Sequence, residues 1–237
     1  MNNQISQPAS FKYLDVIASF FVGILIISNI ASSAKIVDLG FSIFSVPLAF
    51  DGGTILFPFV YVLGDVLTEV YGFKTARRVI WTGFAAMALT TGVFFTLGLM
   101  PAEEFWAAET GGNEAYNAIL GGMSYGGIVL ASLAAYLAGE FSNAAILSKL
   151  KIKMQGRFLW IRTIGSSLVG QLLDTMIFVF IATLTGVFAW EIFWSLVITN
   201  YILKVGIEAL VTPFTYWVSK FLKKKEGIDV YDNINNP

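Results

Sequence analysis

Residues 159–187 read LWIRTIGSSLVGQLLDTMIFVFIATLTGV, and this stretch decides the fold class. It contains two ionisable residues, Arg162 near its beginning and Asp174 near its middle. A helix of about 20 predominantly apolar residues crosses the hydrocarbon core of a bilayer, which is about 30 Å thick. At about 1.5 Å per residue, Asp174 lies about 18 Å beyond Arg162 along such a helix. The stretch therefore predicts a transmembrane helix with a carboxyl group close to the middle of the membrane.

Five other stretches have the same apolar character and about the same length, at residues 13–34, 54–72, 76–100, 124–148 and 191–220. The whole chain is 56% hydrophobic and 13% charged, whereas a soluble domain carries about 25% charged residues. We therefore predict an all-α integral membrane protein, a bundle of six transmembrane helices over residues 13–222 with tails at 1–12 and 223–237. The first stretch could instead be a cleaved signal peptide, because Lys12 precedes it, but it is longer than a typical signal sequence.

Local signals refine the regions beside the second and sixth stretches. Apolar residues nearly alternate over residues 36–50, which indicates a short hairpin or re-entrant strand between the first two helices. Residues 51–54, Asp-Gly-Gly-Thr, then have the composition of a turn whose Asp51 or Thr54 caps the next helix. Pro58 predicts a kink in that helix, and Pro213 predicts a break in the last one.

The distribution of basic residues predicts the orientation in the membrane. Thirteen of the 15 Lys and Arg residues lie before the first stretch, at the junction of the second and third, at the junction of the fourth and fifth, or at and after the end of the sixth. The positive-inside rule places these segments in the cytoplasm, and both termini with them. The opposite side holds an acidic segment at 101–122, where Trp106 favours an amphipathic interfacial segment over a lid that covers a substrate.

Several functional classes are excluded by residues that the chain lacks. It contains no Cys and no His, which excludes disulfides, thiol nucleophiles, Ser–His triads and the usual zinc sites. No GxxxxGK[ST] motif is present, so ATP hydrolysis by a P-loop is excluded. We expect neither a cofactor nor a metal, and the apolar composition excludes a soluble nucleic-acid-binding module.

The interior of the predicted bundle contains polar and ionisable residues at depths where lipid would otherwise surround them. Holding one charge at a bilayer centre costs about 2.5–3.5 kcal/mol, so these side chains must face one another, water or a ligand. By depth and helical spacing, the candidates for a binding site are Asn29, Asp65, Glu69, Glu140, Asn143, Gln171, Asp174, Lys204 and Glu208. Asn29 could equally serve as a hydrogen-bonding contact between helices.

The charged members of this set also have a structural interpretation. Glu69 is shallow enough to form an interfacial salt bridge with Arg77 or Arg78. Lys204 and Glu208 are spaced for an ion pair within one helix. Burying both partners of an ion pair usually costs more than the pair returns, so its presence favours a functional role.

Five motifs extend this pattern. One run, Phe57-Pro58-x-x-Tyr61-x-x-x-Asp65-x-x-x-Glu69-x-Tyr71-Gly72, is followed by Ala76-Arg77. The others are Ser28-Asn29 with Lys35, Gly139-Glu140-x-x-Asn143, Gly170-Gln171-x-x-Asp174 and Lys204-x-x-x-Glu208-x-x-x-x-Pro213. In order and spacing these motifs resemble those of the queuosine precursor transporters, also called the vitamin-uptake-transporter-like family, and the resemblance covers residues 20–220.

The resemblance implies a six-helix importer in the bacterial inner membrane. Its substrates would be precursors of the modified tRNA nucleoside queuosine, namely 7-cyano-7-deazaguanine and its aminomethyl counterpart. Its partners would be one or both of these small molecules and the lipid bilayer. A homo-oligomer is possible, and no nucleic-acid partner is expected. A carboxylate can accept two hydrogen bonds from the N1–H and exocyclic amine of a guanine-like ring. The expected acids are Asp65, Glu69, Asp174 and Glu208, with Asn29, Asn143 and Gln171 as orienting amides and Lys204 as a counter-charge or gate.

Two other functional classes are compatible with part of this pattern. A substrate-binding membrane subunit that docks on a separate ATPase complex would have the same six spans and no nucleotide motif. An intramembrane aspartyl protease needs two acids on different helices, as Asp65 and Asp174 are, but the flanking signatures of such proteases are missing. We therefore do not expect an enzyme.

Overall fold

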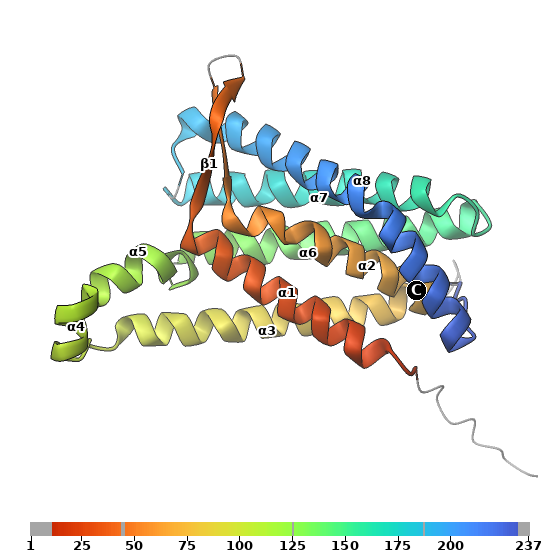
Figure 1. Cartoon of the computed structure of the whole chain (residues 1–237), viewed down its shortest axis with the longest axis horizontal. Coiled ribbons are helices and arrows are strands. Elements are labelled where there is room, and N and C mark those ends of the chain that lie inside the picture. The colour runs from red at the N-terminus through yellow and green to blue at the C-terminus, as the bar shows by residue number, and fades with distance from the viewer. Residues whose placement is uncertain (1–10, 44–45, 125, 187, 232–237) are drawn as a thin grey trace, which may run out of the picture.

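The computed structural model describes residues 11–43, 46–124, 126–186 and 188–231, and long helices dominate it (Figure 1). The long helices are α1 (Leu14–Ala34), α3 (Phe73–Leu99), α6 (Gly126–Lys153), α7 (Leu159–Leu184) and α8 (Phe193–Glu226). All five are long and apolar enough to cross a membrane. The predicted helical membrane architecture is therefore confirmed for five spans.

The sixth predicted span differs from the others in length and burial. Helix α2 (Phe57–Tyr71) has 15 residues and rises about 22 Å, which is shorter than the bilayer core. Twelve of its residues are buried, because α1, α3, α6 and α8 all pack against it. Protein surrounds α2 where lipid surrounds an outer helix, so its length need not match the bilayer. A sixth span therefore stays a prediction.

The structure contradicts the expected effects of two prolines. Pro58 lies in the first turn of α2, where a backbone N–H would have no partner inside the helix, so it begins the helix without kinking it. Pro213 lies inside α8, which continues to Glu226. A membrane helix tolerates an internal proline when neighbouring groups satisfy the freed backbone, so the predicted break is wrong.

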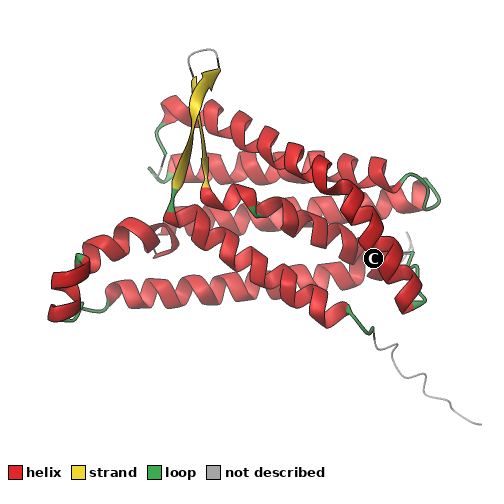
Figure 2. Cartoon of the chain, viewed as in Figure 1, coloured by secondary structure: helices red, strands yellow, loops and turns green. Residues whose placement is uncertain are grey.

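The expected hairpin is present at one end of the bundle (Figure 2). Strands β1 (Ile36–Ile43) and β2 (Val46–Asp51) pair antiparallel, with Ile36 opposite Asp51. A 3-10 turn, η1 (Gly52–Ile55), follows β2, and the Asp51 carboxylate caps it by accepting from the Gly53 N–H at 3.1 Å. The same carboxylate accepts from the Ser32 hydroxyl at 2.5 Å, which fixes the hairpin to the end of α1.

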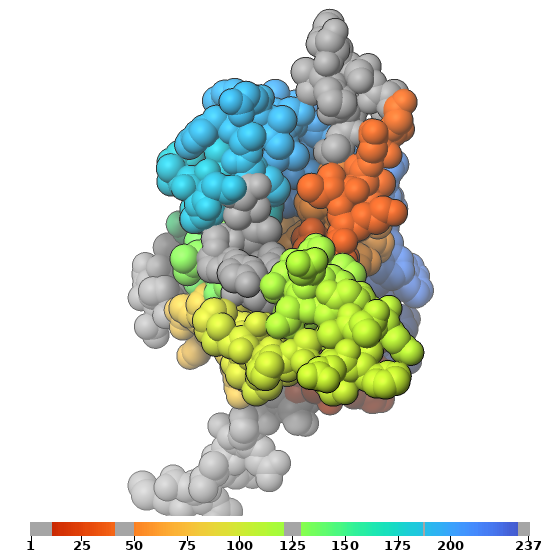
Figure 3. All heavy atoms as spheres, turned by 90° about the vertical axis from the view of Figure 1, so that its left-hand side faces the viewer, coloured from red at the N-terminus to blue at the C-terminus, as the bar shows by residue number. Residues whose placement is uncertain are grey.

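Two short helices, α4 (Glu104–Thr110) and α5 (Gly112–Ser124), form the segment between α3 and α6 at this hairpin end (Figures 1 and 3). Tyr116 donates to the Phe94 carbonyl at 2.7 Å, which docks α5 on α3. Phe105 and Trp106 on α4 are 78% and 46% exposed. Amides of Trp106 and Phe105 donate to Glu103 and lower the pKa of its carboxyl group. The exposed aromatic residues of α4 are compatible with an interfacial segment, which stays a prediction.

Both ends of the described chain lie together at the opposite end of the bundle, which we call the basic end. The Glu226 carboxylate accepts from the backbone N–H groups of Lys12 and Tyr13 at 2.9 and 2.7 Å, which joins the start of α1 to the end of α8. Helix α8 ends at Glu226, so the first residues of the predicted tail, which begins at residue 223, are helical. Residues 1–10 and 232–237, the outer parts of the predicted tails, lie outside the described residues. Which side of the membrane this end faces stays a prediction.

Candidate functional site

All nine candidate residues are buried, with exposed fractions between 0 and 6%. They come from α1, α2, α6, α7 and α8. The structure divides them into a cavity wall near the hairpin end, a hydrogen-bonded layer beneath it and an ion-pair cluster at the basic end. Asn29 and Glu140 lie outside these groups. The Asn29 side-chain amide donates to the Leu25 carbonyl in its own helix at 2.9 Å.

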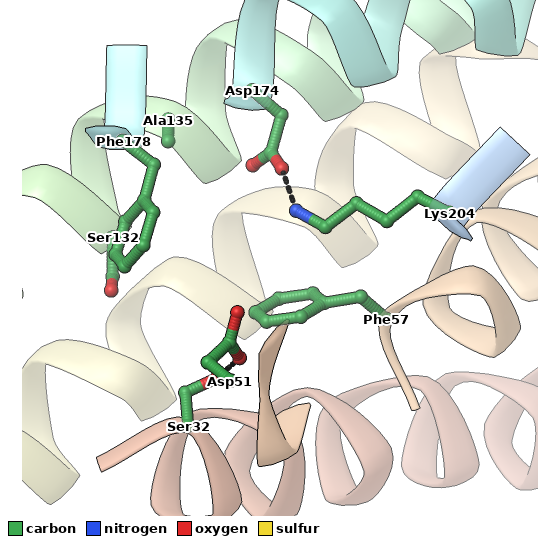
Figure 4. A pocket seen from close by; sticks show the side chains of 8 residues that line it. All are labelled: Ser32, Asp51, Phe57, Ser132, Ala135, Asp174, Phe178 and Lys204. Atoms are coloured by element: carbon green, nitrogen blue, oxygen red, sulfur yellow. Dashed lines mark hydrogen bonds and ion pairs between the residues drawn. The ribbon is translucent and has the colours of Figure 1, made fainter. Parts of the chain in front are cut away.

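An ion pair between α7 and α8 forms the cavity wall (Figure 4). Lys204 Nζ donates to Asp174 Oδ2 at 2.8 Å and lies 4.8 Å from the centre of the Phe57 ring. The predicted pairing of Lys204 with Glu208 is wrong. A lysine that precedes a glutamate by four residues is the less favourable order on a helix, whereas Asp174 faces Lys204 from the adjacent helix.

The cavity lies between this ion pair and the base of the hairpin (Figure 4). Its lining residues are Ser32, Asp51, Phe57, Ser132, Ala135, Asp174, Phe178 and Lys204. Its volume is about 10 Å³, which is close to the space that one water molecule needs. A purine-sized ring does not fit there unless the surrounding helices separate.

Sequence reasoning did not select Asp51, Phe57 or Phe178 as site residues. Asp51 has the sequence context of a turn, but it caps the 3-10 turn η1 and not the helix α2, which begins at Phe57 without a side-chain cap. The same side chain also lines the cavity. Phe57 begins the Phe57-Pro58 motif, and this motif is the sequence signal that could have indicated its place in the site. Phe178 lies in a run of apolar residues and has no distinguishing local pattern.

A hydrogen-bonded layer links the acids and amides of four helices beneath the cavity. The Asn143 side chain on α6 donates to Asp65 Oδ1 on α2 at 2.8 Å. The Ser167 hydroxyl on α7 donates to the side-chain amide oxygen of Asn143 at 3.3 Å. Gln171 on α7 donates to Glu208 on α8. The two amides therefore hold two of the buried acids in place.

Close contact between α6 and α7 makes this layer possible. A Cβ atom added at Gly170 would lie 2.9 Å from the Gly139 carbonyl oxygen, and one at Gly139 would lie 2.8 Å from the Asp174 Cβ. The Tyr61 side chain of α2 occupies the remaining space at this crossing, in contact with both glycines. Any larger residue at either glycine would push the helices apart, so the two glycines determine which polar residues meet.

Several buried oxygen atoms near this crossing have no hydrogen-bond partner among the described residues. They are the Tyr61 hydroxyl, both carboxylate oxygens of Glu140, Gln171 Oε1, Thr175 Oγ1 and Glu208 Oε1. Buried polar groups are normally hydrogen-bonded, and each exception calls for an explanation. An interior with spare acceptors is suited to a ligand that brings hydrogen-bond donors.

A comparison with known proteins assigns the chain to a family. A family model described as "Putative vitamin uptake transporter" matches residues 51–218, which is well over half of the chain. The chain belongs to this family. The matched range contains every candidate residue except Asn29. The family consists of transporters, so the intramembrane-protease alternative no longer applies.

Individual relatives of this transporter carry a more specific description. The "Queuosine precursor transporter" of Escherichia coli (strain K12) is 26% identical over 208 residues, 87% of this chain and 86% of its own. The "Probable queuosine precursor transporter" of Bacillus subtilis (strain 168) is 28% identical over 175 residues, 73% of each chain. A protein described in the same words from Haemophilus influenzae is 24% identical over 73% of this chain and 70% of its own. No solved structure matches the transporter significantly.

The third group of polar residues is an ion-pair cluster at the basic end of the transporter, where Glu69, Arg162 and Lys223 also line a cavity of about 220 Å³. Glu69 of α2 accepts from Arg162 at 2.5 and 3.2 Å and from Lys223 at 2.5 Å, and Lys151 lies 3.9 Å away. The alternative interpretation of Glu69, a salt bridge with nearby cations, is therefore correct in kind. The predicted partners, Arg77 and Arg78, are wrong, because the observed partners are Arg162, Lys223 and Lys151. Arg162 is fully buried because it folds back from the start of α7 toward α2, which its position in a basic loop did not reveal.

The segment after α8 in the transporter reinforces this cluster. Asp229 accepts from Lys151 at 2.6 Å and lies 2.9 Å from Lys223. Burial by itself would raise the pKa of the Asp229 carboxyl group, but hydrogen bonds from the two lysines hold that pKa below its ordinary value. Lys151 also donates to the Val230 carbonyl at 2.6 Å. The C-terminal segment thereby ties α6 and α8 together over Glu69.

Proposed function

We propose that this chain imports queuosine precursors, 7-cyano-7-deazaguanine, its aminomethyl counterpart or both, across the bacterial inner membrane. The observation that carries the proposal is the buried Asp174–Lys204 pair, which forms the wall of a cavity also lined by Phe57 and Phe178. Family membership supports transport, and the descriptions of the relatives support this substrate class.

The chemistry of a 7-deazaguanine ring complements this wall. Its N1–H and exocyclic amine are adjacent donors, which the Asp174 carboxylate can accept in a bidentate, charge-assisted pair. Lys204 can then donate to the neighbouring ring carbonyl, and the flat ring can stack on Phe57. The ligand gives each charged group a new partner as it separates the two, so neither is left buried and uncompensated.

The surrounding polar residues have distinct proposed roles. Gln171 and Asn143 orient Glu208 and Asp65, which hold the ring at a deeper position as it moves through the bundle. Asp51 lines the same cavity and can accept from the ammonium group of an aminomethyl precursor. Asn29 lies on α1 beside this path. Glu140 does not line the cavity, so we do not assign it to the ring.

Transport requires that the two ends of the bundle open in turn. The cavity lies toward the hairpin end and is too small for the ring, while the ion pairs of Glu69 join four helices at the basic end. We place the basic end and both termini in the cytoplasm, with α2 completing a six-span path. Separating Lys204 from Asp174 opens the first barrier, and separating the cations from Glu69 opens the second.

Uptake in a host that cannot synthesise these precursors tests the proposal. The precursor is supplied in the medium, and the queuosine content of tRNA is measured. A charge-assisted hydrogen bond contributes about 1.5–3 kcal/mol, so Asp174→Asn and Lys204→Met should each reduce initial uptake about 10- to 100-fold. Glu191→Gln, at an exposed position in the 3-10 turn η2 (Trp190–Ile192), is the matched control and should transport normally.

Near-normal uptake by both site variants, at equal amounts in the membrane, would contradict the assignment of the site. The purified chain in liposomes separates an autonomous importer from a binding subunit that depends on an ATPase complex. An importer takes up radiolabelled precursor without any other protein, and a binding subunit binds the precursor but does not move it.

A further inference from the structure

Glu140 differs from the other acids in the middle of the bundle. Its side chain is 1% exposed, and neither carboxylate oxygen has a hydrogen-bond partner among the described residues. By contrast, Asp65 accepts from Asn143, Asp174 from Lys204 and Glu208 from Gln171. Glu140 therefore lacks the compensation that each of these other carboxylates receives.

The Glu140 carboxyl group is packed closely against α2 and α1. A Cβ atom added at Gly64 of α2 would lie 2.7 Å from Glu140 Oε2, and the Phe21 ring of α1 packs at the same place. Glycine at position 64 leaves room for the carboxyl group against the α2 backbone. Burying an ionised carboxylate without a partner costs far more than one fold can supply, so this site accommodates the carboxyl group in its neutral form.

The groups that face Glu140 are mostly acidic or neutral. The neighbouring titratable side chains are Tyr136 on α6 itself, Tyr61 and Asp65 on α2, Asp174 on α7 and Glu208 on α8. Lys204, the cation in this part of the bundle, is bound to Asp174. Tyr136 donates to the Ile80 carbonyl of α3 at 2.8 Å. The Tyr61 hydroxyl, which interacts electrostatically with Asp65, Glu140, Asp174 and Glu208, has no partner among the described residues.

We propose that Glu140 is the proton-binding site of a proton-coupled importer, with Tyr61 positioned between Glu140 and the acids that hold the substrate. When the hairpin end is open, the Glu140 carboxylate takes a proton from hydronium in the entering water, so an O–H bond of hydronium breaks, the O–H bond on Glu140 forms and a water molecule is left. The O–H bond on Glu140 breaks by proton transfer to water when the basic end is open, so one proton moves inward with the precursor. This proposal rests on the function proposed above.

Purified full-length protein in liposomes tests the coupling with radiolabelled 7-cyano-7-deazaguanine. With a more acidic exterior, wild-type protein should accumulate the precursor above the external concentration, and an ionophore should abolish the accumulation. One pH unit supports about a tenfold accumulation for one coupled proton. The Glu140→Gln variant keeps the shape of the neutral acid but cannot exchange a proton. It should lose accumulation and retain counterflow, the exchange of labelled for unlabelled precursor, while Glu140→Asp should recover part of the accumulation.

A second measurement does not depend on a variant. Adding precursor to wild-type liposomes that contain a pH-sensitive dye should acidify their interior. Active counterflow without acidification, or accumulation by Glu140→Gln equal to that of wild type, would overturn proton binding at Glu140. Wild-type liposomes that show no counterflow at all would instead contradict the proposed transport function, so the two failures are distinguishable.

Discussion

Lys204 and Asp174 stabilise each other at the cavity wall, and this mutual dependence has a measurable consequence. Removing one partner of a buried ion pair leaves the other charge uncompensated and costs about 3–5 kcal/mol, whereas replacing both can be nearly neutral. We therefore expect Lys204→Met and Asp174→Asn to lower the unfolding temperature in detergent, and the double variant to recover most of the loss. The measurement is thermal unfolding monitored by size-exclusion chromatography.

Uptake should respond differently from stability in the same three proteins. The double variant should remain as inactive as the single ones, because the precursor needs both groups. If the double variant were the least stable of the three, the pair would not be the source of the stability, and the interpretation of the cavity wall would be wrong.

Adding one methyl group at Gly139 tests the close contact between α6 and α7. Overpacking a tight site costs about 1–3 kcal/mol, so Gly139→Ala should destabilise the protein by that amount. A Cβ atom added at Gly206 on α8 would meet no neighbouring atom within 4 Å, so Gly206→Ala should be neutral or slightly stabilising. Equal unfolding temperatures for the two variants would show that α6 and α7 are not in close contact at Gly139.

At the scale of helices, α2 is enclosed by its neighbours and is anchored at its end by Glu69. Its carboxylate meets cations from α6, α7 and α8, so four helices depend on one side chain. A cluster of this kind holds the end of α2 in place at the basic end, while packing by α1, α3, α6 and α8 buries the rest of the helix.

The stabilities of two arginine variants distinguish the observed partner of Glu69 from the partners predicted from the sequence. Arg162→Met removes the bidentate contact and should cost about 3–5 kcal/mol, because Glu69 loses its most buried partner. Arg78→Met, at an exposed position on α3, should change stability by less than about 0.5 kcal/mol. Unfolding of the two purified variants under identical conditions measures the difference. A larger effect at Arg78 would contradict the observed pairing.

For the whole molecule, the path of the chain predicts which segments face the same compartment. The chain contains no Cys, so a single introduced cysteine reports its own location. A cysteine at Phe105 on α4 should react with a membrane-impermeant maleimide in intact spheroplasts. A cysteine at Lys224 near the end of α8 should react only after the membrane is permeabilised. Labelling of both in intact spheroplasts would overturn the six-span path and the cytoplasmic placement of the termini.

Much of the architecture could be predicted because it depends on local composition. Long apolar stretches identify membrane helices wherever they occur, and near-alternation followed by Asp-Gly-Gly-Thr identified the hairpin and the turn after it. Helical spacing also indicated that the nine candidate residues face inward, and all nine are buried. Lipid surrounds most of the bundle, so polar residues in these stretches have no other favourable position.

The partners of those residues were decided by the tertiary structure alone. Lys204 contacts Asp174 rather than the glutamate four residues away, and Glu69 contacts Arg162 rather than the nearby loop arginines. These pairs depend on where helices cross, which Gly139 and Gly170 determine through close contact between α6 and α7. The sequence by itself determined which side chains turn away from lipid, because hydropathy acts on each residue separately. Only packing between distant segments decided which of them meet, and among the described residues it gave Glu140 no hydrogen-bond partner.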